Sequence, residues 1–206
     1  MSRVGSTPTG DQGSAFKKGS GDPTDELDNL VIFNRELIDS GVIKYSKSDK
    51  GELIEVNGLV YDDGIGKGKA FVDAVNKGWS KSFKTESGMV EMRVSLSTTD
   101  VEADAAIRLV GCSMSECKST MSSDGTVSSV LGMAVRGDSV IKLRSDAVSS
   151  TFVHEFGHSL GLGHQLNSTN SIMSYSDGRR VKAGDVSRLM EAYRSPFAYY
   201  KKHWGY

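Results

Sequence analysis

Three of the four histidines of this chain, His154, His158 and His164, lie within eleven residues of one another. On a helix, positions i and i+4 lie on the same face, so His154 and His158 can direct their imidazoles at one point. Gly161 allows the chain to leave the helix with a positive φ and to return His164 to the same point. Three imidazoles with a fourth position left to water are typical of a catalytic zinc ion. We therefore expect these three histidines to bind one zinc ion, although the same ligands also accept cobalt, manganese or iron.

Glu155 directly follows the first candidate ligand and can lean over the metal without binding it. In this place its carboxylate can accept a proton from water and pass it to the leaving amine of a cleaved peptide bond. We expect a Glu155→Ala variant to keep its metal and to lose hydrolysis. The alternative is a non-catalytic zinc-binding domain that uses the metal for stability or partner recognition. A third interpretation, an interaction module with incidental histidines, leaves the clustering of the histidines unexplained.

The histidine motif, taken together with the segment Ser171-Ile172-Met173-Ser174-Tyr175, resembles the metzincin clan of zinc proteases. In that clan a methionine, matched here by Met173, forms an apolar floor beneath the metal-binding histidines. Tyr175 matches the tyrosine of the astacin-like and serralysin-like branches, which binds the resting zinc and stabilises the transition state. Gln165, the residue after the third histidine, matches none of the common branches, so the branch stays open. The resemblance implies a zinc endopeptidase in which Tyr175 assists Glu155.

The resemblance also implies an α+β fold of two subdomains. The upper one, to about residue 164, is a twisted mixed β-sheet with two long helices, of which one carries the zinc motif. The lower one, residues 165–206, is small and mostly irregular and ends in a helix. The edge strand of the sheet, expected at residues 130–135, pairs with an extended protein or peptide substrate in that clan.

Hydrophobic periodicity predicts further elements. We expect helices at residues 27–43 and 71–79, strands at 90–97 and 140–143, and a strand or hairpin at 53–61 with Asn57-Gly58 as a turn signal. The Arg-Gly-Asp at residues 136–138 is interpreted as a tight turn rather than an integrin-binding motif.

Capping patterns position the helices around the candidate site. Ser149, Ser150 or Thr151 is expected to cap the zinc helix, whose ligand face should open on a cleft. Residues 181–184 are expected to form a loop, with Asp185 as the N-cap of the last helix. The aromatic C-terminal end is expected to dock on the core, with His203 on the surface.

The composition suits one domain of 206 residues with a net charge of −1. Residues 1–24 are rich in Gly, Ser, Thr, Pro and Asp and predict a disordered tail or linker, a pro-segment or a junction to a delivery protein. Residues 25–206 are expected to form the single protease domain, as a monomer. The balanced charge argues against nucleic acid as a partner, and no apolar run approaches the length of a membrane span.

The N-terminus lacks the apolar core of a secretory signal peptide. Secretion or delivery by a route that needs no signal peptide is therefore favoured, and the cytoplasm is the alternative. A compact protease with a linker-like N-terminus resembles a bacterial toxin or effector domain, which an inhibitor or immunity protein restrains. Cys112 and Cys117 form either a local disulfide, which would indicate an oxidising compartment, or two free thiols.

Overall fold

The computed structural model describes residues 30–113, 115–117, 119–121, 127–165, 171–174 and 180–204. The expected tail at residues 1–24 and the candidate Tyr175 lie outside these residues. The described part is a mixed α+β fold of five α-helices, one short 3₁₀ helix and nine strands. The helices are α2 (Arg35–Asp39), α3 (Gly68–Trp79), α4 (Ser149–Ser159), α5 (Ala183–Arg194) and α6 (Pro196–Trp204). The strands are β1 (Ile43–Ser48), β2 (Gly51–Asp62), β3 (Lys81–Thr85), β4 (Gly88–Thr99), β5 (Ile107–Gly111), β6 (Ser119–Met121), β7 (Val127–Ser129), β8 (Gly132–Ala134) and β9 (Val140–Leu143).

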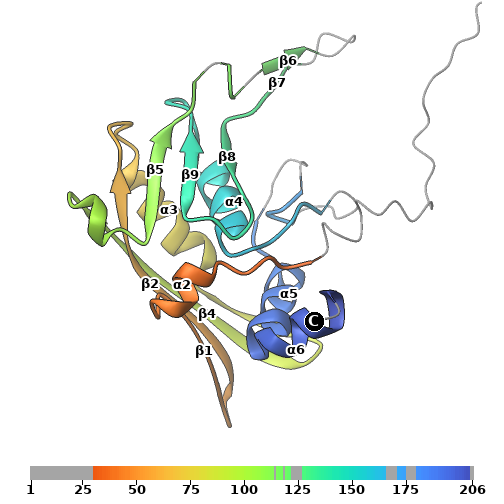
Figure 1. The fold of residues 1–206 in the computed structure, drawn as a ribbon. Helices are drawn as coiled ribbons and strands as arrows, with labels where there is room; N and C mark the ends of the chain where they lie inside the picture. The colour runs from red at the N-terminus through yellow and green to blue at the C-terminus, as the bar shows by residue number, and fades with distance from the viewer. Residues whose placement is uncertain are drawn as a thin grey trace, which may run out of the picture.

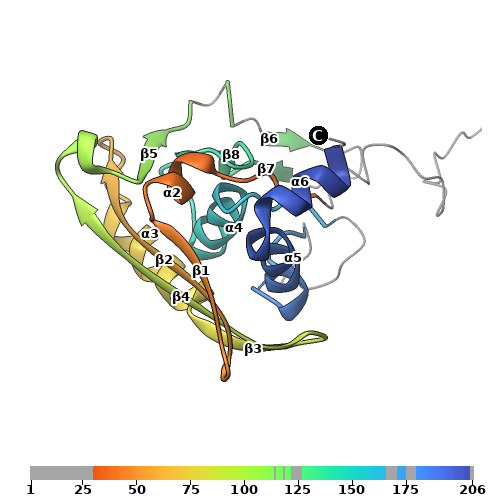
Figure 2. The same cartoon turned by 60° about the horizontal axis from the view of Figure 1, so that its bottom comes forward.

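Seven strands form one curled mixed sheet in the order β3-β4-β2-β5-β9-β8, with β1 also paired to β2 (Figures 1 and 2). The long strand β2 shares one edge between two partners, since its first half pairs antiparallel with β1 and its last three residues pair parallel with β5. Strands β4, β2, β5 and β9 run parallel, whereas β8 returns antiparallel to β9. Strand β8 therefore forms one end of the sheet, directly before the strand that leads into α4.

Helices α3 and α4 pack against each other, α3 against β4, and α4 against β8 and β9. The apolar stripe of α3 consists of Phe71, Val75 and Trp79, which are all fully buried. On strand β4 every second residue is buried, as expected for a strand with one face in water. The buried residues are Val90, Met92, Val94 and Leu96. The indole Nε1 of Trp79 donates to the carbonyl oxygen of Val153 at 3.1 Å, which fixes α4 on α3.

Helices α5 and α6 close the other side of α4 (Figure 2). The hydroxyl of Tyr193 donates to the carbonyl oxygen of Leu160 at 3.0 Å, where α4 ends. The hydroxyl of Tyr199 accepts the backbone N–H of Val31 at 2.8 Å, and the ring of Phe33 contacts both tyrosines edge-on. Tyr199 and Tyr200 of the aromatic C-terminal end thus dock on the core, as predicted, whereas Phe197 is 79% exposed.

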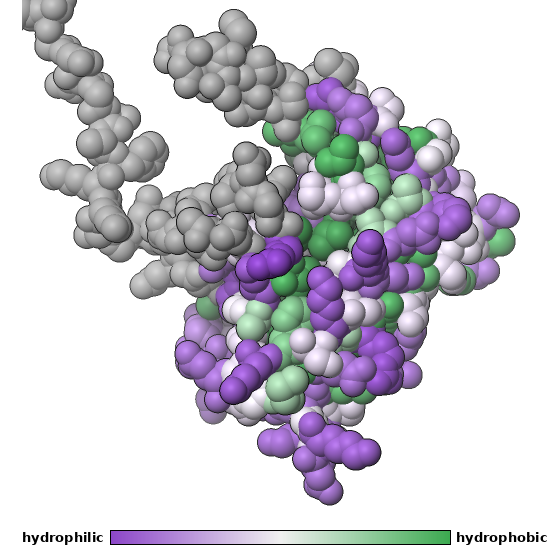
Figure 3. All heavy atoms as spheres, turned by 180° about the vertical axis from the view of Figure 1, so that it is seen from behind, coloured by the Kyte–Doolittle hydropathy of each residue, from purple (hydrophilic) through white to green (hydrophobic). Residues whose placement is uncertain are grey.

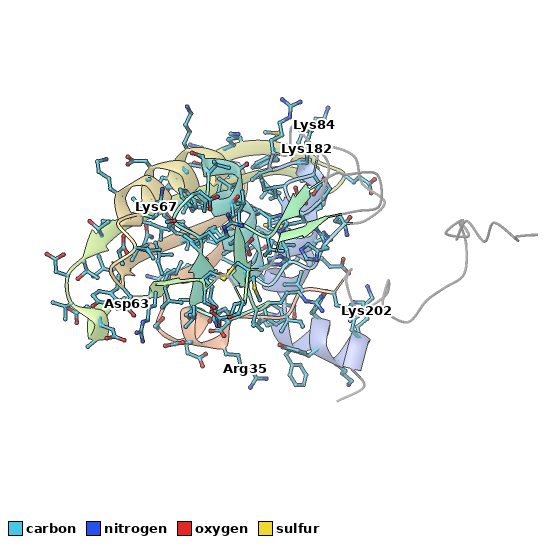
Figure 4. The ribbon with its side chains drawn as sticks, turned by 90° about the horizontal axis from the view of Figure 1, so that it is seen from above. Arg35, Asp63, Lys67, Lys84, Lys182 and Lys202 are labelled. Carbon is cyan, nitrogen blue, oxygen red and sulfur yellow. A yellow bond between two sulfur atoms is a disulfide. The ribbon has the colours of Figure 1, made fainter. Side chains whose placement is uncertain are left out.

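Charged side chains surround this core. The hydrophilic tip of the β1–β2 hairpin projects from the molecule (Figure 3), and Arg35, Lys84, Lys182 and Lys202 point outward around its periphery (Figure 4). None of the described helices combines the length and the apolar character that crossing a membrane requires.

The predicted helix at residues 27–43 is wrong over most of its described length, since only Arg35–Asp39 are helical and β1 begins at Ile43. Residues 31–33 have no regular secondary structure and lie between two loops. The N–H of Ile32 donates to the oxygen of Gly161 at 2.9 Å, and a Cβ on Gly137 would stand 2.6 Å from the oxygen of Ile32. The apolar residues of this segment are therefore buried by the loops rather than by one helical face.

The strand predicted at residues 53–61 is confirmed, but its hairpin alternative is wrong because β2 runs unbroken through Asn57-Gly58. Gly58 instead provides close packing, since a Cβ there would stand 2.9 Å from the Cβ of Ala106. The turn at residues 136–138 is confirmed, with the N–H of Asp138 donating to Val135 and a φ of 72° at Gly137.

Several predicted boundaries also shift. The zinc-motif helix is capped by Val148 rather than by Ser149, Ser150 or Thr151, because the carbonyl of Val148 already accepts the N–H of Thr151. Helix α5 begins at Ala183, within the predicted loop. Asp185 is thus not the N-cap but the third helical residue, and its carboxylate accepts the N–H of Lys182 at 2.9 Å.

The remaining differences are small. Strand β8 is shorter than the predicted strand at residues 130–135, and β9 matches its prediction. Among the described residues after 164 there are two helices, α5 and α6, where one was expected. Cys112 and Cys117 form a disulfide with their Cα atoms 5.9 Å apart.

Candidate metal centre

The three histidines of the motif come together at one point. His154 and His158 lie on consecutive turns of α4, and Gly161, with a φ of 101°, turns the chain back so that His164 faces both. One ligand nitrogen from each lies within 4.8 Å of the other two, and the Nε2 atoms of His158 and His164 are 3.1 Å apart. Two nitrogens bound tetrahedrally to zinc at about 2.0–2.1 Å are about 3.4 Å apart. The triad is therefore close enough to bind a metal ion.

Two backbone carbonyls set the orientation of the imidazoles on α4. The Nδ1 of His154 lies 2.6 Å from the oxygen of Ile172, and the Nδ1 of His158 lies 2.7 Å from the oxygen of Leu162. A carbonyl oxygen only accepts, so both Nδ1 atoms carry the proton and both Nε2 atoms present a lone pair. This tautomer is the one that a metal ligand needs, which makes the donor set fit a divalent ion.

Burial keeps His158 neutral. His154 is 4% exposed and His158 is 5% exposed, so the ligand face of α4 is buried rather than exposed as expected, while His164 is half-buried. Burial, followed by the electrostatic interaction with the His154 imidazole, lowers the pKa of His158 to about 3. The imidazole of His158 is therefore uncharged at neutral pH and needs no deprotonation to bind a cation.

Glu155 is a residue of α4, and its side chain packs against the edge strand β8. It is 5% exposed, and a Cβ added to Gly132 would stand 2.9 Å from its Cγ. Gly132 thus leaves room for Glu155 beside the first ligand, a contact that the sequence did not indicate because it joins residues 23 positions apart. The structure places Glu155 on the same helix as two of the ligands and next to the strand that ends the sheet.

Met173 packs against α4 next to Gly157. It is fully buried, and a Cβ on Gly157 would stand 2.5 Å from its Sδ. Gly157, between the two ligands of α4, therefore allows the thioether to approach the helix. The oxygen of Met173 accepts the N–H of Gln165 at 2.9 Å, next to the third ligand. His203 is exposed and belongs to α6, apart from this cluster.

Comparison with models of known protein families and with curated proteins finds no match to this chain. The chemistry of this chain is therefore inferred from the geometry of His154, Glu155, His158 and His164.

Proposed function

We propose that this chain is a zinc-dependent endopeptidase of the metzincin type. The observation that carries the proposal is the convergence of three imidazole nitrogens within 4.8 Å, with Glu155 beside them on the same helix. The mixed sheet before α4, the turn at residues 171–174 and the helices α5 and α6 after it support this proposal.

Zinc is the ion that three neutral imidazoles with an open position suit best. His154, His158 and His164 would hold it. Bound there, it would polarise a substrate carbonyl and lower the pKa of water toward neutrality.

The role of Glu155 follows from its position next to the first ligand. Its carboxylate accepts the proton of the attacking water, and the same oxygen donates that proton to the nitrogen of the leaving amine. Burial at 5% exposure removes competing bulk water from the carboxylate, which strengthens its interactions with a bound substrate. Tyr175 is proposed to stabilise the oxyanion, as the resemblance implies.

The substrate is proposed to bind as an extended strand along β8. This strand ends the sheet order, and among the described strands only β9 pairs with it. Pairing through backbone groups recognises an extended conformation rather than a sequence, which suits a protein or peptide substrate. Glu155 packs beside Gly132 of this strand, so the paired backbone would pass the proposed base.

The test compares the wild type with Glu155→Gln for cleavage of an unfolded protein such as casein, with bound zinc quantified in both. Glutamine keeps the size of the side chain and removes its basicity. We expect one zinc per chain in both proteins and a loss of hydrolysis of at least about 100-fold in the variant. Glu52→Gln is the matched control, because Glu52 is a buried glutamate of similar exposure, 7%, on β2.

The outcomes separate the two functions that the motif allows. Hydrolysis that persists in Glu155→Gln would contradict the assignment of the base. Zinc in both proteins with cleavage in neither would favour the non-catalytic zinc-binding domain.

A further inference from the structure

A buried carboxylate on α5 holds the turn beneath the histidines. Asp185 is 2% exposed and accepts the hydroxyl of Ser171 at 2.6 Å through Oδ1. Its Oδ2 accepts the N–H of Lys182 at 2.9 Å, and the guanidinium of Arg188 lies 3.3 Å from Oδ1. Both carboxylate oxygens thus accept hydrogen bonds in a site that is buried from water. The bond from Ser171 joins α5 to the segment that carries Met173.

Ser171 connects Asp185 to the turn at residues 171–174 through two further hydrogen bonds. Its Oγ accepts the N–H of Met173 at 3.0 Å, and its carbonyl accepts the hydroxyl of Ser174 at 2.9 Å. The residue enclosed by these bonds is Ile172, whose carbonyl receives the Nδ1–H of His154. The position of the Ile172 oxygen is therefore set by the bonds on either side of it.

The same turn also reaches the third ligand. The oxygen of Met173 accepts the N–H of Gln165, which adjoins His164. Arg188, one turn after Asp185, lies 3.5 Å from the oxygen of Gly163, on the other side of His164. Helix α5 thus contacts the segments that orient two of the three histidines.

We propose that Asp185, acting through the hydroxyl of Ser171, is a positioning residue that fixes the turn and thereby aims His154 and His164 at the metal. The inference rests on the proposed metal site but not on hydrolysis. Partners of this kind, which orient ligands without touching the metal, commonly set metal affinity by factors of about 10–100.

The competing explanation is that Asp185 only stabilises the start of α5. A carboxylate at the third helical position that accepts the N–H of the preceding cap does so in many helices. Such a role predicts a loss of folding stability with unchanged metal affinity. The bond to Ser171 predicts a loss of metal affinity as well, so the two explanations differ in a measurable quantity.

The experiment measures the zinc affinity of the full chain by competition with a chromophoric chelator, for the wild type, Asp185→Asn and Ser171→Ala. Thermal unfolding of the metal-free proteins is recorded beside it. We expect both variants to bind zinc about 10–100-fold more weakly. The visible spectrum of the cobalt-loaded protein should change in band position or intensity, because the ligand geometry changes. Ser171→Ala removes a single hydroxyl, which keeps the test available if Asp185→Asn folds poorly.

Asp62→Asn is the matched control. Asp62, at the end of β2, also supports the start of a helix. It accepts the N–H groups of Ile65, Lys67 and Gly68, of which Gly68 is the first residue of α3, and these bonds stay within residues 62–68. The same chemical change should lower the unfolding temperature there and leave zinc affinity unchanged.

The double variant Asp185→Asn, Ser171→Ala completes the cycle. If the two residues act through one hydrogen bond, the double variant loses little more affinity than the weaker-binding single variant. Zinc affinity within about twofold of the wild type in Asp185→Asn and Ser171→Ala would overturn the proposal. A wild type that binds no zinc would overturn it together with the metal site, whereas a wild type that binds zinc and cleaves nothing would refute only the endopeptidase.

Discussion

Gly161 is a residue at which the path of the chain depends on the lack of a side chain. Its φ of 101° lies in the region that favours glycine, and an added Cβ would collide with the carbonyl oxygen of Ile32. The same two residues are joined by the bond from the N–H of Ile32 to the oxygen of Gly161. The turn that brings His164 to the other two histidines is therefore held against Ile32 in two ways. Its carbonyl at Gly161 accepts a hydrogen bond from the N–H of Ile32, and its Cα at Gly161 lies against the oxygen of Ile32.

Gly161→Ala should accordingly lower stability and weaken metal binding together. Gly88→Ala is its control, since Gly88 has a φ of 123° but open space where a Cβ would stand. We expect Gly88→Ala to cost about 1–3 kcal/mol of unfolding free energy from backbone strain alone. Gly161→Ala should cost more than that, because strain and collision add, and urea unfolding of both variants measures the difference. Equal losses would show that the contact with Ile32 relaxes freely.

The ligand set could be predicted from the sequence because it depends on local spacing within α4 and one turn. The groups that orient the ligands could not. These groups are the carbonyl of Ile172, the space at Gly132 and the carboxylate of Asp185. They lie near the histidines only because the folded chain reverses direction, and no local sequence pattern indicates this. Asp185 was recognised as a helix-start residue, but its bond to Ser171 depends on how α5 packs.

At the scale of elements, an ion pair fastens α5 to the sheet. The guanidinium of Arg194 lies 2.6 Å from the carboxylate of Glu52 on β2, which also accepts the hydroxyl of Tyr45 at 3.2 Å. Burial raises the pKa of Glu52, but the hydrogen bond and charge of Arg194 outweigh it and hold the pKa below its ordinary value of 4.5. The folded protein therefore binds this proton less readily than the unfolded chain does.

The sign of the resulting pH dependence follows. Stability from this pair is present above the ordinary pKa of glutamate and is lost as the pH falls through the lower pKa of the folded state. We expect the unfolding free energy of the wild type to fall more steeply between about pH 6 and pH 3 than that of Glu52→Gln. Urea unfolding across this range measures both slopes. Parallel curves would contradict a contribution of Glu52.

Elements whose burial follows one period were predictable, and those buried by several neighbours were not. Helix α3 and strand β4 each present one apolar face to the core. Their apolar residues therefore recur in the sequence with periods of about 3.6 and 2 residues. Residues 31–33 combine buried Val31 and Phe33 with a backbone that has no regular secondary structure and is held between loops. The spacing of the apolar residues there predicted a helix. The loops that bury these residues are distant in the chain, so the sequence pattern did not reveal them.

At the scale of the molecule, one continuous hydrophobic core joins the sheet to helices α3, α4 and α5 and to Tyr199 of α6. The three histidines lie at the edge of this core, on α4 and on the segment that leads from it toward α5. A metal ion bound to all three would link the helix to that segment in the folded state, and the unfolded chain does not hold the ligands in this arrangement. Binding energy at the site should therefore appear as stability of the whole fold.

Zinc should raise the unfolding temperature of the wild type, and a strong chelator should reverse the rise. Free zinc at about 100 times its dissociation constant contributes about 2.7 kcal/mol, if the unfolded chain does not bind it. His164→Ala should abolish most of this rise, because it removes a ligand that is only half-buried and disturbs the core least. His203→Ala should retain the rise in full, since His203 is exposed on α6 and outside the cluster. Thermal unfolding with and without zinc measures all three proteins, and an equal rise in His164→Ala would show that zinc stabilises the fold from another site.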